Sequence, residues 1–476
     1  MNINAYPINA SQVCLRITAP PPLEEAAATA ATATAAAPRP SVHFIAAVDV
    51  SDSMRNNNQL GNVVQSLKFL LDYMTPADAM SVIIFGSDAE VVLRQVRTTP
   101  EQKDMIRFRL DQLSPSGMTN ISAALSYVPE LVMAGYTQGL LVLTDGEVNM
   151  GVTAVADLTR MAVTLIDTHP SLSLTMVGYG VGHNSALCRG MATATSGTYN
   201  VVNSLENVAT AFGDTLGGLT TCALQQVRML LPAGVTQRSA FPIRGPDREL
   251  FVGDILEGNE AIVLLDTSAT VDPLVLTVRC TSVATGIAIS VPVVIHPDPT
   301  PEEVMAGIIA SLRFRVVALL QGIQGPPTAF PALLAECTEL RGILTPLGAS
   351  SSLVPLLLGE VERCAAIAAA PAATMSRQQA SIVSQRTAYL GMGRGVLSQD
   401  PDDTDPTAAP GAAPGAAPAI DRSFSNPVQR AMSDGMRAAS SAVAGVATAA
   451  TVATVAAPDS PPLIIRSGRA PSIANY

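Results

Sequence analysis

Between residues 42 and 219, short apolar runs alternate with longer segments of helical periodicity. Residues 42–50 read VHFIAAVDV, a nearly continuous apolar run that is typical of a strand buried on both faces. The segment 60–71 then carries apolar residues three and four positions apart, which indicates an amphipathic helix. Similar apolar runs recur at 139–146 and 172–180, with helical segments between them. The alternation predicts an α/β fold, a doubly wound and mostly parallel sheet covered by helices on both sides.

Side chains that carry oxygen atoms follow the ends of two of these strands. Asp49, Ser51 and Ser53 lie where the first strand turns into its helix, and Asp145 lies in LTDG, at the end of a later strand. Thr119 comes from the sequence SGMTNIS before another helix. Ligands of doubly wound sheets bind beyond the carboxyl ends of the strands, so we expect these five residues to form one site.

The five residues offer only oxygen ligands. This donor set favours a hard divalent cation, with Mg²⁺ as the first choice and Mn²⁺ or Ca²⁺ as alternatives, over zinc or copper. Two carboxylates and three hydroxyls supply fewer than six ligands, so water or a carboxylate of a partner would complete the coordination.

The pattern DxSxS, followed in order by GMTN and LTDG, resembles the metal-ion-dependent adhesion site of von Willebrand factor type A (VWA) domains. The resemblance covers about residues 40–215, and every ligand position of the motif matches. It implies a Rossmann-like VWA fold and a protein ligand that presents an Asp or Glu to the metal. In the position between the two serines, where the family usually has glycine, this chain has Asp52. Asp52 is either a solvated carboxylate pointing away from the ion or a group that strengthens cation binding and repels an acidic ligand.

Residues 12–22, QVCLRITAPPP, are similar to the strand that precedes such domains in intracellular plant, fungal and protist proteins. In those proteins a β-rich region and a helical region follow the domain. The RING module of some plant members is missing here, so the resemblance does not imply ligase activity.

The spacing of apolar residues changes again in the rest of the chain. After residue 220, short β-rich runs separated by Gly, Pro and Asp predict an antiparallel sandwich, and a helical region follows it. The alternating segment 12–19 has no neighbouring strand expected before residue 42, so we predict that it pairs with this sandwich. The predicted regions are an N-terminal strand (1–23), an Ala/Pro linker (24–40), the VWA domain (41–219), the β-sandwich (220–298), a helical region (299–395) and a disordered Ala/Pro-rich tail (396–476).

Residues 438–457 are uncharged and long enough to span a bilayer, but half of them are alanine and none is Leu, Ile or Phe. We therefore expect a flexible tail there in preference to a membrane span. The first residues lack a basic segment followed by an apolar core, so no signal peptide is expected. Six widely spaced cysteines suit buried thiols in a reducing compartment, and together these features predict an intracellular, cytoplasmic protein.

The chain carries 39 acidic and 28 basic residues, a net charge of −11, which argues against nucleic acid as a partner. His43 lies inside the first apolar run and is interpreted as a hydrogen-bonded core histidine. The glycine-rich segment 178–182 lacks both the spacing and the lysine of a phosphate-binding loop, so it is interpreted as the end of a strand.

Three functions fit these features. The first is a non-enzymatic protein–protein interaction module that binds its partner through the metal. The second is a structural component of an assembly or particle, in which the metal only stabilises the fold. The third is the VWA subunit of an AAA+ machine. Metal-dependent binding of a partner would separate the first from the second.

Overall fold

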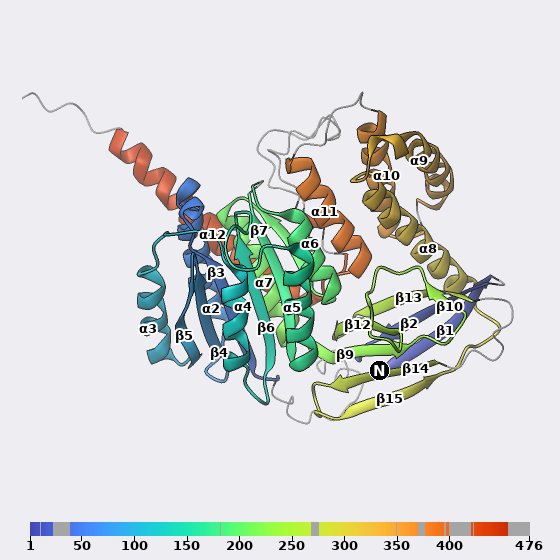
Figure 1. Ribbon diagram of the computed structural model, residues 1–476, viewed down its shortest axis with the longest axis horizontal. Helices are drawn as coiled ribbons and strands as arrows, with labels where there is room; N and C mark the ends of the chain where they lie inside the picture. Colours follow the sequence, from blue (N-terminus) through green and yellow to red (C-terminus); the bar gives the residue numbers. More distant parts are fainter. Residues whose placement is uncertain are drawn as a thin grey trace, which may run out of the picture.

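The computed structural model describes residues 1–9, 11–21, 39–180, 182–267, 276–348, 350–369, 377–394, 397–398, 420–421 and 423–455. Three bodies are visible in Figure 1: an α/β domain, a β-sandwich and a group of helices beside the sandwich. The predicted Ala/Pro linker lies almost entirely outside the described residues.

The α/β domain is built on a six-stranded sheet. In spatial order its strands are β5 (Ala89–Arg97), β4 (Ala79–Phe85), β3 (Val42–Asp49), β6 (Thr137–Thr144), β7 (Leu172–Tyr179) and β8 (Thr198–Val202). All neighbouring strands are parallel except β4 and β5, which are antiparallel. The predicted mostly parallel sheet is therefore confirmed.

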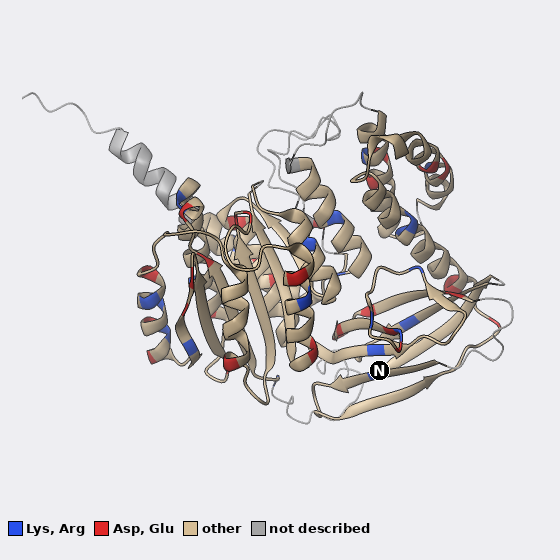
Figure 2. Ribbon diagram, viewed as in Figure 1, with Lys and Arg blue, Asp and Glu red and all other residues tan. Residues whose placement is uncertain are grey.

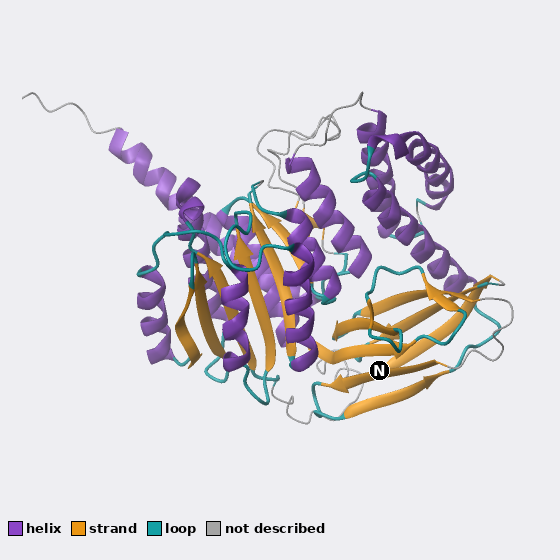
Figure 3. Ribbon diagram, viewed as in Figure 1, coloured by secondary structure: helices purple, strands orange, loops and turns teal. Residues whose placement is uncertain are grey.

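Helices cover both faces of this sheet (Figure 3). On one face lie α2 (Gln59–Tyr73), α3 (Pro100–Asp111) and α7 (Leu205–Thr220), and on the other lie α4 (Ile121–Leu131), α5 (Val155–Thr168) and α6 (Ser185–Ala194). Side chains alternate along a strand, so Phe44 and Val48 of β3 enter the first core while Ile45 enters the second. This double burial is why residues 42–48 are almost uniformly apolar.

Two elements of this domain, α6 and β8, were not predicted from the sequence. The α6 sequence SALCRGMATA has few large apolar residues, and β8 is five residues long with the polar Asn200 at its centre. The side chain of Asn184 nevertheless begins α6, because its oxygen accepts a hydrogen bond from the backbone N–H of Leu187.

The sandwich has two antiparallel sheets. One contains β1 (Asn2–Asn9), β2 (Gln12–Thr18), β13 (Glu260–Thr267) and β10 (Val235–Gln237). The other contains β11 (Ile243–Arg244), β12 (Glu249–Leu256), β9 (Cys222–Leu230), β14 (Leu276–Ser282) and β15 (Ala288–Val293). The N-terminal strand β2 pairs with β13, with Leu15 opposite Val263, which is the pairing predicted for residues 12–19.

The expectation that no strand before residue 42 accompanies β2 is wrong, because β1 pairs with it as the other half of a hairpin. The β1 sequence NINAYPIN does not predict a strand, since Asn recurs along it and Pro7 lies near its end, and both residues are rare in strands. Proline is tolerated here because β1 lies at the edge of its sheet, where not every N–H needs a partner.

The helical region contains α8 (Pro301–Gly322), α9 (Phe330–Leu344), α10 (Leu353–Ala369) and α11 (Arg377–Met392), with short 3₁₀ turns at Pro327–Ala329 and Thr345–Leu347. Helix α8 covers the outer face of the β1–β2 sheet, where Phe314 packs with Tyr6 and Cys14. Gly307 permits this approach, since a side chain there would meet Ile8 at 2.8 Å.

Within the region where a disordered tail is predicted from the sequence, the structure describes a helix, α12 (Pro427–Val455), which lies along α7. Met436 of α12 is fully buried in the core that also contains side chains of α7. Close approach of the two backbones adds to this contact. A methyl group at Gly213 would lie 2.9 Å from the Cα of Ser433, so glycine lets the two backbones meet. Apart from β16 (Leu397–Ser398) and β17 (Ile420–Asp421), most of the remaining tail lies outside the described residues. Among the helices of the described residues, none combines the length and the apolar character needed to cross a bilayer.

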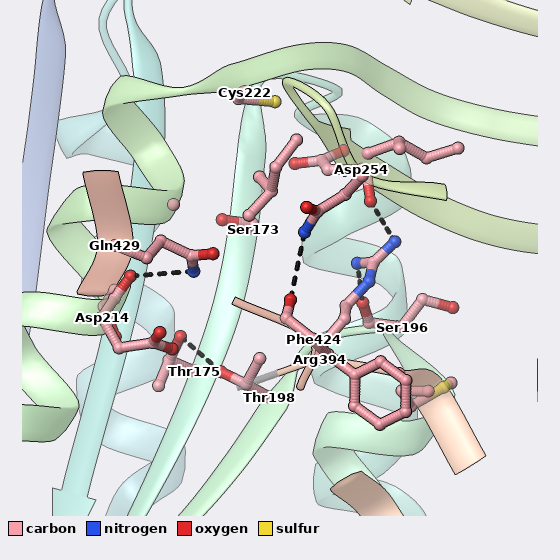
Figure 4. Close-up of a pocket in the computed structure, with 18 of the residues that line it drawn as sticks. Ser173, Thr175, Ser196, Thr198, Asp214, Cys222, Asp254, Arg394, Phe424 and Gln429 are labelled. Carbon is pink, nitrogen blue, oxygen red and sulfur yellow. Dashed lines mark hydrogen bonds between the residues drawn. The ribbon is translucent and has the colours of Figure 1, made fainter. Parts of the chain in front are cut away.

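Arg394, which follows α11, joins the α/β domain to the sandwich (Figure 4). Its guanidinium donates hydrogen bonds to the carbonyl of Ser196 at 2.6 Å, to the carbonyl of Val252 at 2.9 Å, and to the carbonyl of Asp254. Burial raises the pKa of Asp254 to about 6, and the charge of Arg394 opposes that rise. A cavity of about 90 Å³ beside these groups has room for a few water molecules.

Arg394→Ala is expected to destabilise the protein by about 3 kcal/mol, because three buried carbonyls and a buried carboxylate would lose their partner. Scanning calorimetry measures the change. The control is Arg160→Ala, which removes an exposed arginine paired with Asp157 and should leave the melting temperature unchanged. Equal melting temperatures of Arg394→Ala and the wild type would contradict the role of Arg394 in joining the α/β domain to the sandwich.

Candidate metal centre

The site predicted from the sequence lies at the carboxyl ends of β3 and β6, where loops connect the strands to the helices (Figure 3). Asp49 is the last residue of β3, and Asp145 directly follows β6. Ser51 directly precedes the 3₁₀ segment Asp52–Asn58, Ser53 lies within that segment, and Thr119 precedes α4.

Asp49 is fully buried and is held from two sides. Its Oδ1 accepts a hydrogen bond from the backbone N–H of Ser51 at 2.8 Å, and its Oδ2 accepts one from the Thr144 hydroxyl at 2.6 Å. The carboxylate orientation is therefore set before any ligand binds.

The two serines connect the β3 loop to the β6 loop. The hydroxyl oxygens of Ser51 and Ser53 are 3.0 Å apart, and the Ser53 hydroxyl donates to Asp145 Oδ1 at 2.6 Å. Hydrogen bonds thus run from one predicted ligand loop to the other.

Thr119 reaches the same place from a third loop. A side chain at Gly146 would lie 3.3 Å from the Thr119 hydroxyl oxygen and 3.7 Å from that of Ser53, so both hydroxyls lie over Gly146. The fold therefore gathers all five predicted residues, although the ligand role of each stays a prediction.

Two residues outside the set of predicted ligands position the site. Thr144 is the last residue of β6, and Asn149 lies in the loop that follows Asp145. The Asn149 side-chain oxygen accepts a hydrogen bond from the Thr119 N–H at 2.8 Å, and the Asn149 N–H donates to the Thr119 carbonyl at 3.2 Å. The one available signal was that Thr144 immediately precedes Asp145 in LTDG.

The site concentrates negative charge in a buried place. Burial raises the pKa of Asp49 to about 6, and the carboxylate of Asp145 contributes to the rise. Burial also raises the pKa of Asp145. Within the part of the chain that the structure describes, no Lys, Arg or His forms an ion pair with either carboxylate. Two uncompensated carboxylates beside three hydroxyls fit a hard divalent cation.

Asp52, the departure from the family pattern, points away from this cluster. Its carboxylate is exposed and lies 3.4 Å from the guanidinium of Arg55. This geometry agrees with the interpretation of Asp52 as a solvated side chain.

His43 is a core histidine, as predicted. Its Nδ1–H donates to Gln138 Oε1 at 3.0 Å, and its Nε2 accepts from the Ser81 hydroxyl at 2.8 Å. Gln138 Oε1 also accepts from the Met133 N–H, which fixes the amide orientation and therefore the neutral tautomer of the ring. Burial lowers the pKa of His43 to about 4.

A histidine side chain of the protein packs against the glycine-rich segment, which begins at Gly178 near the end of β7. A methyl group at Gly178 would lie 2.2 Å from the ring of His183, whose Nε2 is 2.5 Å from the Tyr199 hydroxyl.

In the described residues, no three His, Cys, Asp or Glu side chains are grouped to hold a metal. An ion held by Asp49 and Asp145 would therefore depend on the hydroxyls of the site as well. All six cysteines are buried and free.

Comparison with known families identifies this domain. Residues 44–147 match the family model of the von Willebrand factor type A domain. This part of the chain is therefore a von Willebrand factor type A domain. Domains of this family generally act as non-enzymatic interaction modules and commonly bind a divalent cation at a metal-ion-dependent adhesion site.

Two solved structures resemble the chain beyond these residues. A von Willebrand factor type A protein from Catenulispora acidiphila is 15% identical, with a TM-score of 0.54, over 79% of this chain and 92% of that chain. The ArnB paralog VWA2 from Sulfolobus acidocaldarius is 12% identical, with a TM-score of 0.52, over 83% of this chain and 99% of that chain. At these identities the likeness shows the fold alone.

A relative in sequence is the uncharacterized protein YfbK of Escherichia coli (strain K12). It is 22% identical over 208 residues, which are 42% of this chain and 35% of that protein. The match thus spans about a third of that relative. The similarity to plant, fungal and protist proteins stays a prediction.

Asp49→Asn is expected to lower Mg²⁺ affinity by about tenfold or more, because it removes one of two carboxylates. The amide keeps the shape and can still accept the Ser51 hydrogen bond. In EDTA the variant should melt no lower than the wild type, because it loses a buried charge that faces Asp145. Titration calorimetry and melting curves measure both effects. Asp52→Asn, the control, should change Mg²⁺ affinity much less, and unchanged affinity in a folded Asp49 variant would exclude the site.

The low pKa of His43 in the folded protein predicts that stability depends on pH. The unfolded chain protonates this ring near pH 6.5 and the folded chain near pH 4. The neutral ring therefore contributes fully above pH 6.5, and about 3 kcal/mol is lost as the pH falls to 4. Urea unfolding of the wild type and of His43→Asn at several pH values measures this loss of unfolding free energy. The wild type should lose more stability between pH 7 and 4 than the variant, and parallel curves would contradict the assignment.

Proposed function

We propose that this protein is a non-enzymatic interaction module whose VWA domain binds a protein partner through a divalent cation. The cation, with Mg²⁺ as the first choice, is held by Asp49, Ser51, Ser53, Thr119 and Asp145. The observation that carries the proposal is the convergence of two buried carboxylates and three hydroxyls at one end of the sheet.

The charge of this donor set leaves a role for a partner. Two carboxylates neutralise a divalent cation, and the five side chains do not fill a six-fold coordination shell. An Asp or Glu of a partner can occupy the remaining position, and the bond to the cation is strengthened by charge in a partly dry interface. A metal that served only stability would usually be enclosed by more protein ligands.

Two large apolar side chains beside the cluster support a protein ligand. Met118, which precedes Thr119, is 52% exposed. Met150 is 41% exposed, and its N–H donates to the Thr119 carbonyl. Methionine side chains are adaptable and are common on surfaces that bind other proteins. The metal centre therefore has an apolar rim against which a partner can pack.

The charge distribution supports a protein partner over nucleic acid. Basic and acidic positions are interspersed over the bodies drawn in Figure 2, and no basic cluster stands out among the described residues in this view. An intracellular location remains a prediction from the sequence.

One observation favours the structural alternative. Because Ser53 links the two ligand loops, a cation bound there would tie them more firmly, as in proteins that a metal stabilises. The third interpretation, a subunit of an AAA+ machine, is neither favoured nor tested by these features.

Thr119→Ala separates the first two functions. It removes one hydroxyl ligand and keeps both carboxylates, so it should strongly reduce retention of the partner while changing the melting temperature little. The measurement is affinity capture on immobilised protein with Mg²⁺ or EDTA, followed by mass spectrometry. The supporting result is a specific protein that is retained with Mg²⁺ and lost both in EDTA and on Thr119→Ala. The control is Thr168→Ala, an exposed threonine at the far end of α5, which should retain the partner normally.

The opposite pattern would assign the metal to stability. If Thr119→Ala melts far below the wild type while an EDTA-sensitive partner is still retained, the structural alternative replaces the interaction module.

A further inference from the structure

A second cleft, which shares no residue with the metal centre, lies between the sandwich and the helical region. Its volume is about 800 Å³, and its walls come from β2, β13, α8, the N-terminal end of α10 and residues 423–430. This volume is within the range of sites that bind small organic molecules.

The cleft contains a buried arginine with an unusual environment. Arg313 of α8 is only 4% exposed and lines the cleft. Its Nε has no hydrogen-bond partner, and Arg313 forms no ion pair with the carboxylates of the described residues. Its guanidinium lies 4.5 Å from the ring centre of Phe314 and 5.5 Å from that of Phe424. Burial lowers its pKa to about 10.

Arg394, a second arginine of this protein, shows which contacts Arg313 lacks. Arg394 is partly buried and donates hydrogen bonds to three carbonyls, which gives it a structural role. Arg313 donates none to any described residue. The charge of Glu260 acts on Arg313, but Glu260 is already paired with Arg16. A buried cation without a hydrogen-bonded partner is costly, so an anion that enters the cleft would gain a strong interaction.

The other charged side chains of the cleft leave an excess of positive charge. Arg16 pairs with Glu260 at 2.6 Å, and the Arg430 Nε donates to the Ser425 carbonyl at 2.9 Å. Glu302, at the start of α8, is the remaining charged residue of the lining. Among the described residues of the lining, three arginines face two glutamates, so this lining is net positive in a chain of net charge −11.

The end of α10 adds a second electrostatic contribution. Ser350, Ser351 and Ser352 line the cleft before this helix, and the Ser351 hydroxyl oxygen accepts from the N–H of Leu353. The N-terminal end of a helix carries a partial positive charge and attracts anions. Here the buried Arg313 lines the same cleft, so two independent features favour negative charge.

Part of the lining is apolar. Met305, Ala306 and Ile309 come from α8, and Ile262 comes from β13. A ligand that fits the whole cleft therefore has a charged end and an apolar body.

We propose that this cleft binds a small organic anion, with its carboxylate or phosphate group at Arg313 and the end of α10 and its apolar body along α8. The site is independent of the metal centre, so it stands whether or not the VWA domain binds a partner.

Titration calorimetry on the full-length protein tests the site with four probes: octanoate, octyl phosphate, 1-octanol and inorganic phosphate. At least one octyl anion should bind with one-to-one stoichiometry. Octanol lacks the charge and inorganic phosphate lacks the apolar body, so each should bind about tenfold more weakly or not at all. Which octyl anion binds more tightly decides between a carboxylate and a phosphate head.

Arg313→Met should weaken binding of the octyl anion by about tenfold or more, and Arg313→Lys should restore part of it. The matched control is Arg315→Met, two residues along α8, where the arginine pairs with Glu336 and Glu339 and is not part of the cleft. It should bind as the wild type does. Without ligand, Arg313→Met should melt no lower than the wild type, because methionine replaces an unpaired cation among apolar groups.

Three results would overturn the proposal. They are no binding of either octyl anion, equal binding by Arg313→Met and the wild type, or a melting temperature of Arg313→Met far below that of the wild type. The last result would assign Arg313 a structural role.

Discussion

The parallel pairing of β3 with β6 is the contact on which the rest of the α/β domain depends. Val48 lies opposite Leu143, so the two strands end together and Asp49 comes beside Thr144. Because β3 is buried on both faces, a shift by one residue would exchange Phe44 and Ile45 between two different cores. The register is therefore strongly determined, and with it the meeting of the two carboxylates.

Residues far apart in the sequence hold the three bodies together. The hairpin β1–β2 completes a sandwich whose other strands come more than two hundred residues later. Arg394 connects that sandwich to the α/β domain, and α12 returns to lie on α7 through Gly213. The contacts of the C-terminal half thus support the domain that carries the candidate metal centre.

Polar groups in this protein are buried in two distinct ways. His43 and Arg394 are surrounded by partners of matching geometry, and their burial serves the fold. Asp49, Asp145 and Arg313 keep charge that no described side chain of opposite sign pairs with. Uncompensated buried charge is costly to a fold, and it is consistent with a ligand of opposite charge in both places.

The sequence by itself determined the sheet except β8, its covering helices except α6, and the five candidate ligands, because strand burial and helical spacing are local patterns that need no knowledge of distant contacts. It also predicted the pairing of residues 12–19, since an alternating strand must find a partner. Only the tertiary structure placed Thr144 beside Asp49 and Asn149 beside Thr119, because these contacts depend on register and loop path. The same holds for α12, whose close approach to α7 depends on the glycines of that helix, and for Arg313, whose neighbours come from distant parts of the chain.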